Sequence, residues 1–325
     1  MMEDILLNLV PLAASTLRGA TPLILAALAG LFAERAGVVD IGLEGKMLGA
    51  AFAAASAAAV TGSAWMGLGA GIIFSIALAM VHGVTVITYR GDQIVSGMAI
   101  NIVVAGLAPS LANAWFGLNG QTPFLDGGSR FTTITLPFAD AVRDVPLIGG
   151  LYSGVLSGHS IPTYLAFLSV PVALWVLFKT RFGLMLRAVG ENPEAVDTAG
   201  LSVFGLRYRA LIITGILCGI AGAAMAIALS SGFIRDMSAG KGYLALAAMI
   251  LGRWRPVQTM LACLLFAFAD ALQGVLQGVD LPLVGVVPAP FIIMLPYVIT
   301  VVVMAGFVGR IQAPRASGIP YVKER

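Results

Sequence analysis

Five long stretches of this 325-residue chain contain no Asp, Glu, Lys or Arg: 47–89, 93–125, 145–178, 210–234 and 281–309. A helix that crosses the ~30 Å apolar core of a bilayer needs roughly 20 mostly apolar residues, so each stretch has room for at least one such helix. A soluble globular protein cannot bury this much apolar sequence. The lack of charge therefore predicts a protein that crosses a membrane several times.

Other patterns are missing, and each absence excludes a class of protein. Cys218 and Cys263 are the two cysteines and both lie in apolar runs, which excludes a disulfide framework. No G-x-x-x-x-G-K-[ST] loop occurs, so we do not expect the chain itself to bind or hydrolyse ATP. Glu3 and Asp4 stand where a secretory signal peptide would be basic, so we expect the first apolar segment to be retained.

Enzyme signatures are absent as well. His82 and His159 lie in separate apolar regions, and neither an H-E-x-x-H nor a G-x-S-x-G motif occurs. We therefore expect each histidine to form hydrogen bonds within a helix bundle, and we predict no catalytic residue and no metal site. The basic residues behind the net charge of +3 cluster between apolar segments, which argues against a nucleic-acid partner.

The apolar runs are continuous rather than alternating, and 59% of the residues are hydrophobic. Because lipid offers no partner to backbone polar groups, such runs are typical of helices. We predict an all-α, polytopic membrane protein with about 8–10 transmembrane helices, forming one domain over residues 1–325. The expected helices lie near 5–17, 19–33, 47–60, 64–88, 94–116, 161–178, 210–229, 257–277 and 291–308. Two shorter apolar pieces, 145–156 and 243–251, are expected to be re-entrant or half-helices.

The positions of Lys and Arg predict the orientation. Segment 179–209, the pair Arg253 and Arg255, and the tail 310–325 are rich in basic residues and are expected in the cytoplasm. The loop at about 117–144 has few and is expected outside. The chain must then cross outward after 209 and come back before Arg253, through residues too polar for an ordinary span. We expect a broken or re-entrant return.

The first polar segment within the apolar sequence is 34–46, which contains Asp40 and Glu44. It can be read as a solvated turn. It can also be read as a buried polar segment, because Asp40 is flanked by apolar residues and an ion there is costly unless it is paired or faces water. Under the second interpretation, Arg18 is the expected partner of the carboxylate.

The second polar segment is 187–200. Asn192 is suited to be a helix N-cap and Pro193 to be the first helical residue, while Glu194 and Asp197 place negative charge near the positive helix end. Gly200 is expected to end this short helix. The helix suits docking into a groove of a soluble partner, but a well-capped connector between two spans would have the same sequence.

Four strings carry a family resemblance: 34–45, 92–97, 187–200 and 245–252. In this order they resemble the permease subunits of bacterial ABC importers of the ribose and branched-chain amino acid group, and most of all the nucleoside-type permeases. The resemblance covers nearly the whole chain. It implies a transport subunit in the bacterial plasma membrane, surrounded by lipid and paired with a related second permease as a heterodimer. It also implies cytoplasmic ATPase subunits that hold ATP and Mg, and an external substrate-binding lipoprotein.

The resemblance also implies roles for particular residues. The predicted ATPase-coupling residues lie in the second polar segment: Glu191, Asn192, Pro193, Glu194, Asp197 and Gly200. The outside loop at 117–144 becomes a candidate surface for the binding protein. The substrate path is expected between the two permeases, with Asp40, Glu44 and Asn101 as candidate lining residues. An interhelical hydrogen bond is an equally good interpretation of Asn101.

Two alternatives remain open at this point. A sugar importer permease would share the same family features. An ion-coupled secondary transporter would use intramembrane carboxylates such as Asp40, Asp270 and Asp280 to carry protons or sodium. These acids are scattered near segment ends, however, and a secondary transporter has no use for a capped cytoplasmic helix.

Overall fold

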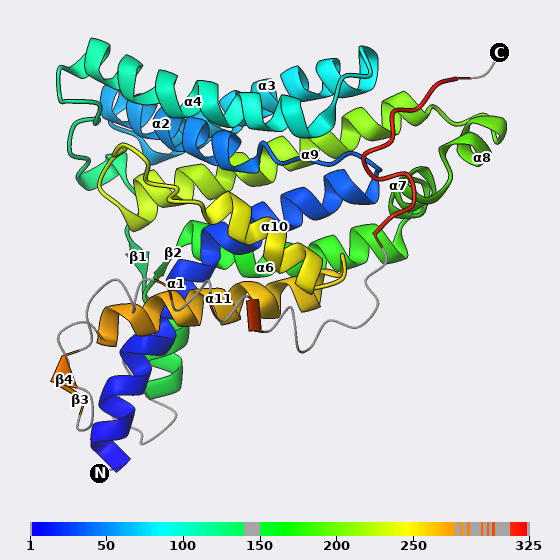
Figure 1. Cartoon of the computed structure of the whole chain (residues 1–325). Coiled ribbons are helices and arrows are strands. Elements are labelled where there is room, and N and C mark those ends of the chain that lie inside the picture. The colour runs from blue at the N-terminus through cyan, green and yellow to red at the C-terminus, as the bar shows by residue number, and fades with distance from the viewer. Residues whose placement is uncertain are drawn as a thin grey trace.

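The computed structural model describes residues 2–139, 150–276 and 313–323, with short pieces at 280–281, 285–286, 294, 298 and 301–302. The described chain is mostly helical, and seven of its helices are long and apolar enough to cross a membrane (Figure 1). The prediction of a polytopic helical membrane protein is confirmed. Most of the expected helix at 291–308 and the first part of the piece at 145–156 lie outside the described residues.

The seven long helices are α1 (Met2–Arg35), α2 (Leu43–Thr61), α3 (Ala64–Gly83), α4 (Gln93–Phe116), α6 (Ile161–Lys179), α9 (Val203–Ala224) and α11 (Pro256–Leu276). Three shorter helices are α7 (Arg181–Glu191), α8 (Pro193–Thr198) and α10 (Lys241–Leu251). Helical turns of other pitch are η1 (Val84–Thr88), η2 (Gly127–Ser129), η3 (Gly150–Leu156) and η4 (Met225–Leu229). Two-residue strands pair antiparallel, β1 (Thr133–Ile134) with β2 (His159–Ser160) and β3 (Asp280–Leu281) with β4 (Gly285–Val286).

The first helix differs from the prediction. The segments 5–17 and 19–33 were expected as two helices, but they form the single helix α1. Arg18, which suggested a break, is exposed and donates a hydrogen bond to Ser15 Oγ at 3.2 Å. An arginine has good helix propensity and can carry its charge away from an apolar surface on its long side chain, so it does not interrupt the helix.

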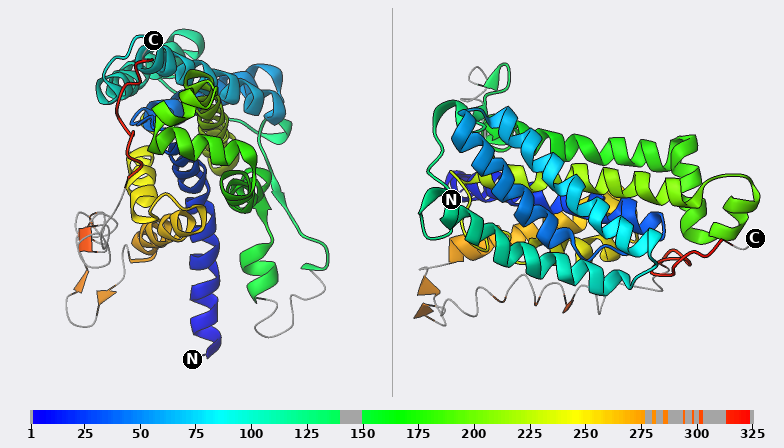
Figure 2. Two further views of the ribbon diagram at one scale, coloured as in Figure 1. Left: turned by 90° about the vertical axis from the view of Figure 1, so that its right-hand side faces the viewer. Right: turned by 90° about the horizontal axis from the view of Figure 1, so that it is seen from above.

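α1 runs through the bundle and packs against α6, α9, α10 and α11, while α2, α3 and α9 form a second layer beside it (Figures 1 and 2). Small residues allow the close contacts of this second layer. A Cβ added at Gly215 would lie 2.7 Å from the Ile76 Cα, and one added at Gly219 would lie 2.5 Å from the Ile72 Cα. Close backbone packing of this kind holds helices together where lipid removes the hydrophobic drive.

The return path after α9 is broken, as predicted. η4 ends at Leu229, residues 230–240 form no regular helix, and α10 follows with 11 residues. A helix of that length is ~16 Å long, about half of what a span requires. The half-helix expected at 243–251 is therefore confirmed within α10.

The ends of the helices gather into two groups (Figure 1). α7, α8, the turn between α10 and α11, and the C-terminal residues 313–323 lie at one end of the bundle. Arg35, at the end of α1, joins this group by donating two hydrogen bonds to the Trp254 carbonyl, at 2.8 and 3.2 Å. The strand pair β1 and β2 lies at the other end. The basic segments thus share one end, although the side of the membrane that this end faces stays a prediction.

Candidate functional site

Residues 230–240 are one break between helices, and the segment 36–42 between α1 and α2 is a second. The site is built around this second break. The Gly45 N–H, in the first turn of α2, donates to Asn101 Oδ1 at 2.8 Å. Asn101 lies eight residues after the start of α4 at Gln93, which is ~12 Å along the helix axis. α2 therefore begins well inside the depth that α4 spans, and the segment 36–42 turns into the bundle to reach it.

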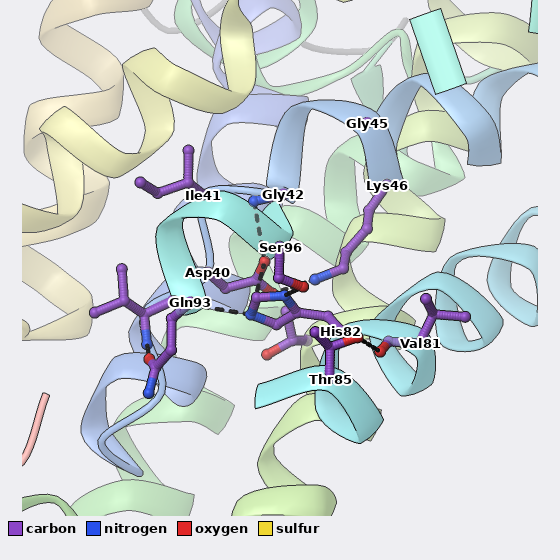
Figure 3. A network of polar contacts seen from close by, with 12 residues as sticks. Asp40, Ile41, Gly42, Gly45, Lys46, Val81, His82, Thr85, Gln93 and Ser96 are labelled. Carbon is purple, nitrogen blue, oxygen red and sulfur yellow. Dashed lines mark hydrogen bonds and ion pairs between the residues drawn. The ribbon is translucent and has the colours of Figure 1, made fainter. Parts of the chain in front are cut away.

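Polar side chains from α3 and α4 satisfy the backbone of this segment (Figure 3). Gln93 Oε1 accepts a hydrogen bond from the Val39 N–H at 2.6 Å, and His82 Nε2 lies 3.1 Å from the Val39 carbonyl oxygen. His82 Nδ1 lies 3.0 Å from Ser96 Oγ. Irregular backbone at membrane depth needs such partners because lipid offers none. The predicted role of His82 in hydrogen bonding within the bundle is confirmed.

Asp40 forms an ion pair with Lys46, and both side chains are completely buried. Asp40 Oδ1 also accepts a hydrogen bond from the Gly42 N–H at 3.1 Å and lies 4.0 Å from His82 Nε2. The expectation that Arg18 pairs with this carboxylate is wrong, because Lys46 does so. In this conformation Asp40 fixes the segment 36–42 and presents no surface to a solute; its role in lining a substrate path stays a prediction.

Glu44 caps the half-helix α10 from a different helix. Its Oε1 accepts from the Gly240 N–H at 2.8 Å and its Oε2 from the Gly242 N–H at 2.6 Å. The first N–H groups of a helix have no partner within the helix, and they form its positive end. Gly242 makes the approach possible, since a Cβ there would lie 2.6 Å from the backbone of Glu44.

Asn101 connects the segment 36–42 with the start of α10. Besides accepting from Gly45, it donates through Nδ2 to the Ile41 carbonyl at 3.0 Å and to Tyr243 Oη at 2.9 Å. It thereby joins α2, α4 and α10 and is itself buried. The interpretation of Asn101 as an interhelical hydrogen-bonding residue is confirmed. Two of the three predicted path residues, Glu44 and Asn101, thus meet where α2 and α10 begin.

Replacing Glu44 with Gln should loosen the start of α10. A neutral amide offers one acceptor oxygen where the carboxylate offers two, so one buried N–H loses its partner at a cost of about 1–3 kcal/mol. We expect a lower midpoint of thermal unfolding for the detergent-solubilised protein. Asp92→Asn is the matched control, because Asp92 is an exposed cap that accepts from Val95, and Asn caps equally well. Equal midpoints for the two variants would contradict the cap.

The segment 187–200 folds as its sequence predicts. Asn192 Oδ1 accepts from the Ala195 N–H at 3.0 Å, Pro193 is the first residue of α8, and Gly200 follows the helix with a φ of +80°. α8 is held on one side by the buried Val196 and leaves Glu194 exposed on the other. The coupling role of these residues stays a prediction, but their exposed face is available to a partner.

The C-terminal residues 313–323 complete this region, an arrangement that was not predicted from the sequence. The Ala316 N–H donates to the Gly190 carbonyl at 2.8 Å, and Lys323 Nζ lies 3.4 Å from Asp197 Oδ1. Tyr321 is buried in an apolar cluster with four residues from α7, α8 and α9: Val189, Val196, Val203 and Leu206. The tail therefore fastens α7 and α8 to α9.

Comparisons with known proteins agree with the resemblance seen in the sequence. Residues 12–304 match a family described as branched-chain amino acid transport system, permease component. The nucleoside ABC transporter permease protein NupC of Lactococcus lactis is 36% identical over 94% of both chains. The guanosine ABC transporter permease protein NupQ of Bacillus subtilis is 37% identical over 95% of both chains.

A third relative has another name. The putative glucose ABC transporter permease protein TsgC13 of Haloferax volcanii is 34% identical over 93% of this chain and 92% of its own. The family match covers most of the chain, and all three relatives align over nearly their full length. The chain therefore belongs to the permease component family of branched-chain amino acid type transport systems, and it is a multi-pass ABC transporter permease rather than an enzyme.

Proposed function

We propose that this chain imports nucleosides, as one of two permease subunits that together form the path through the membrane. ATP and Mg²⁺ are held by separate cytoplasmic ATPase subunits, and an external lipoprotein delivers the nucleoside. The observation that carries the proposal is the 36–37% identity, over nearly the full length, with permeases named for nucleosides and for guanosine. A sugar is the second candidate substrate, because the relative named for glucose is 34% identical.

The start of α10 supports an uncharged solute. A helix N-terminus at membrane depth is a natural site for a carboxylate, because its N–H groups are free and its dipole is positive. Here Glu44 already supplies that carboxylate to Gly240 and Gly242. A zwitterionic amino acid would have to displace it, whereas a nucleoside or a sugar carries no anionic group that needs this position.

The permease itself performs no covalent chemistry in this proposal. ATP binding and hydrolysis on the partner subunits favour inward-facing or outward-facing states, and the helices of the permease respond. Gly190, in α7, packs so closely on the Arg35 carbonyl that a Cβ would clash with it. A displacement of α7 and α8 therefore presses directly on the end of α1, from which the segment 36–42 leads to Asp40 and Glu44.

Radiolabelled guanosine should enter proteoliposomes that contain this chain with its cognate second permease, ATPase and binding lipoprotein, when ATP is supplied. Unlabelled nucleosides should compete better than ribose, glucose or leucine. Full competition by ribose or glucose, with none by nucleosides, would indicate a sugar as the substrate.

The chain alone should neither bind nor hydrolyse ATP, since it lacks a phosphate-binding loop. Uptake by the chain alone, driven by a proton or sodium gradient, would instead indicate a secondary transporter.

A further inference from the structure

One face of α4 is open. α4 is the least buried of the seven described spans. Its exposed residues include a row at helical spacing: Met98, Ile102, Gly106, Ser110 and Asn113. Ser110 Oγ donates to the Gly106 carbonyl at 2.7 Å, but the exposed amide of Asn113 is poorly suited to lipid, which cannot pair with its polar groups. The half of this face near Phe116, which the charge pattern predicts to be the outer half, is therefore expected to meet water or protein.

The structure has a hollow of about 520 Å³ at that outer half, which exceeds the size of a nucleoside. It is lined by small and polar residues of α4 and of the following loop, together with Arg235: Ala105, Gly106, Pro109, Ser110, Asn113, Asn119 and Gly120. Arg235 comes from the irregular segment 230–240. Because irregular backbone in a membrane protein is tolerated where it is buried or faces a water-filled cavity, this hollow is a suitable outer opening for a polar solute.

Tyr243 lies at the inner end of the same face. Its hydroxyl accepts a hydrogen bond from Asn101 at 2.9 Å and lies 4.0 Å from the Met98 sulfur. The residue is nevertheless 42% exposed. Tyrosines are common at membrane interfaces. Tyr243, however, is hydrogen-bonded to Asn101, which lies ~12 Å along the axis of α4 from the start of that helix. The hydrogen bond of its hydroxyl group thus holds the Tyr243 ring within the depth that α4 spans, beside the exposed face of α4.

We propose that Tyr243 is the platform on which the nucleobase stacks as a nucleoside passes along α4, after entering through the hollow at Asn113 and Arg235. The inference rests on the proposed function and names the residue that distinguishes a nucleoside from a plain sugar. Bases stack on aromatic side chains whatever their hydrogen-bonding edge, because every base has a π-face. Loss of such a contact weakens binding by roughly 5- to 150-fold.

Photolabelling of the complete transporter tests the contact directly. With 8-azidoguanosine as the probe, the labelled peptides should include the start of α10, and unlabelled guanosine should suppress this labelling while ribose does not. Tyr243→Phe keeps the ring and should keep the label; Tyr243→Leu should lose it. Labels confined to other peptides in the wild-type complex would overturn the proposal.

Transport gives the second measurement. The ring contact should favour purines, which offer more stacking area than pyrimidines, so Tyr243→Leu should lower guanosine uptake more than cytidine uptake. Tyr243→Phe should keep the wild-type ratio of the two rates. Tyr89→Leu is the matched control, because Tyr89 is 78% exposed and lies after η1, away from α10.

The outcomes separate the two proposals. If the wild-type complex imports no nucleoside, the proposed function fails. If it imports nucleosides but Tyr243→Leu keeps the guanosine-to-cytidine ratio, the stacking platform fails alone. Equal losses in Tyr243→Phe and Tyr243→Leu would assign the effect to the hydrogen bond with Asn101, and this too would overturn the proposal.

Discussion

Replacing Lys46 with Met should leave little folded permease in the membrane. Lys46 is the partner of Asp40, and both side chains have no exposure to solvent. Removing one member of a buried ion pair leaves an uncompensated charge and costs about 3–5 kcal/mol, which is a large part of the stability of a typical domain. We expect a much lower abundance in membranes and a lower midpoint of thermal unfolding for the protein that remains.

A second substitution should restore the fold. In the double variant Asp40→Asn, Lys46→Met the buried charge is gone, and the amide oxygen of Asn can still accept from the Gly42 N–H as Asp40 does at 3.1 Å. Replacement of a whole buried pair is often neutral, so most of the lost abundance should return. Lys179→Met, at an exposed lysine, is the control. Wild-type abundance in Lys46→Met alone would favour the solvated turn over the buried pair.

The local features of this fold could be predicted from the sequence. Hydropathy located the long spans, because lipid requires a continuous apolar run for each of them. The half-helix α10 followed from charge and length, since the chain had too few apolar residues to return as an ordinary span. The caps of α8 followed from Asn192, Pro193 and Gly200, whose preferences act within a single turn of helix.

The long-range partners could not be predicted. Asp40 and Lys46 are six residues apart, a spacing that does not place them on one face of a helix, and they meet only because the segment 36–42 turns into the bundle. Glu44 caps residues almost 200 positions further along the chain. The site therefore depends on the tertiary fold, while the sequence alone named Asp40, Glu44 and Asn101 only as candidate residues of the substrate path.

The continuity of α1 and the docking of the tail were missed for a related reason. The expected helices 5–17 and 19–33 were separated at the charged residue Arg18, but Arg18 is exposed and does not interrupt α1. The tail 313–323 has no helical or strand period, and nothing in its sequence indicated that Tyr321 would be buried. The position of such a tail is determined by its contacts with the folded protein, here the apolar cluster of α7, α8 and α9 residues around Tyr321.

Glu194→Lys should leave the permease folded but uncouple it from its ATPase. Glu194 lies in the first turn of α8, where a positive charge weakens the helix by roughly 0.3–1 kcal/mol. That cost is too small to prevent folding, since Val196 and the Asn192 cap still hold α8 in place. If the exposed face of α8 docks on the ATPase through Glu194, reversal of its charge costs several kcal/mol at the interface.

Substrate-stimulated ATPase activity and nucleoside uptake should therefore fall together in Glu194→Lys, at normal abundance in the membrane, because each ~1.4 kcal/mol lost from docking lowers the association constant about tenfold. Lys323→Met is the matched control beside the same helix: it removes the ion pair to Asp197, which is worth about 0–1 kcal/mol, and changes no residue of α8. Gly200→Pro changes the end of α8 instead, at a φ of +80° that proline cannot adopt. Normal uptake and stimulation in both Glu194→Lys and Gly200→Pro would make α8 a connector. Docking would then have to be sought at Arg253 and Arg255, which lie at the same end of the bundle.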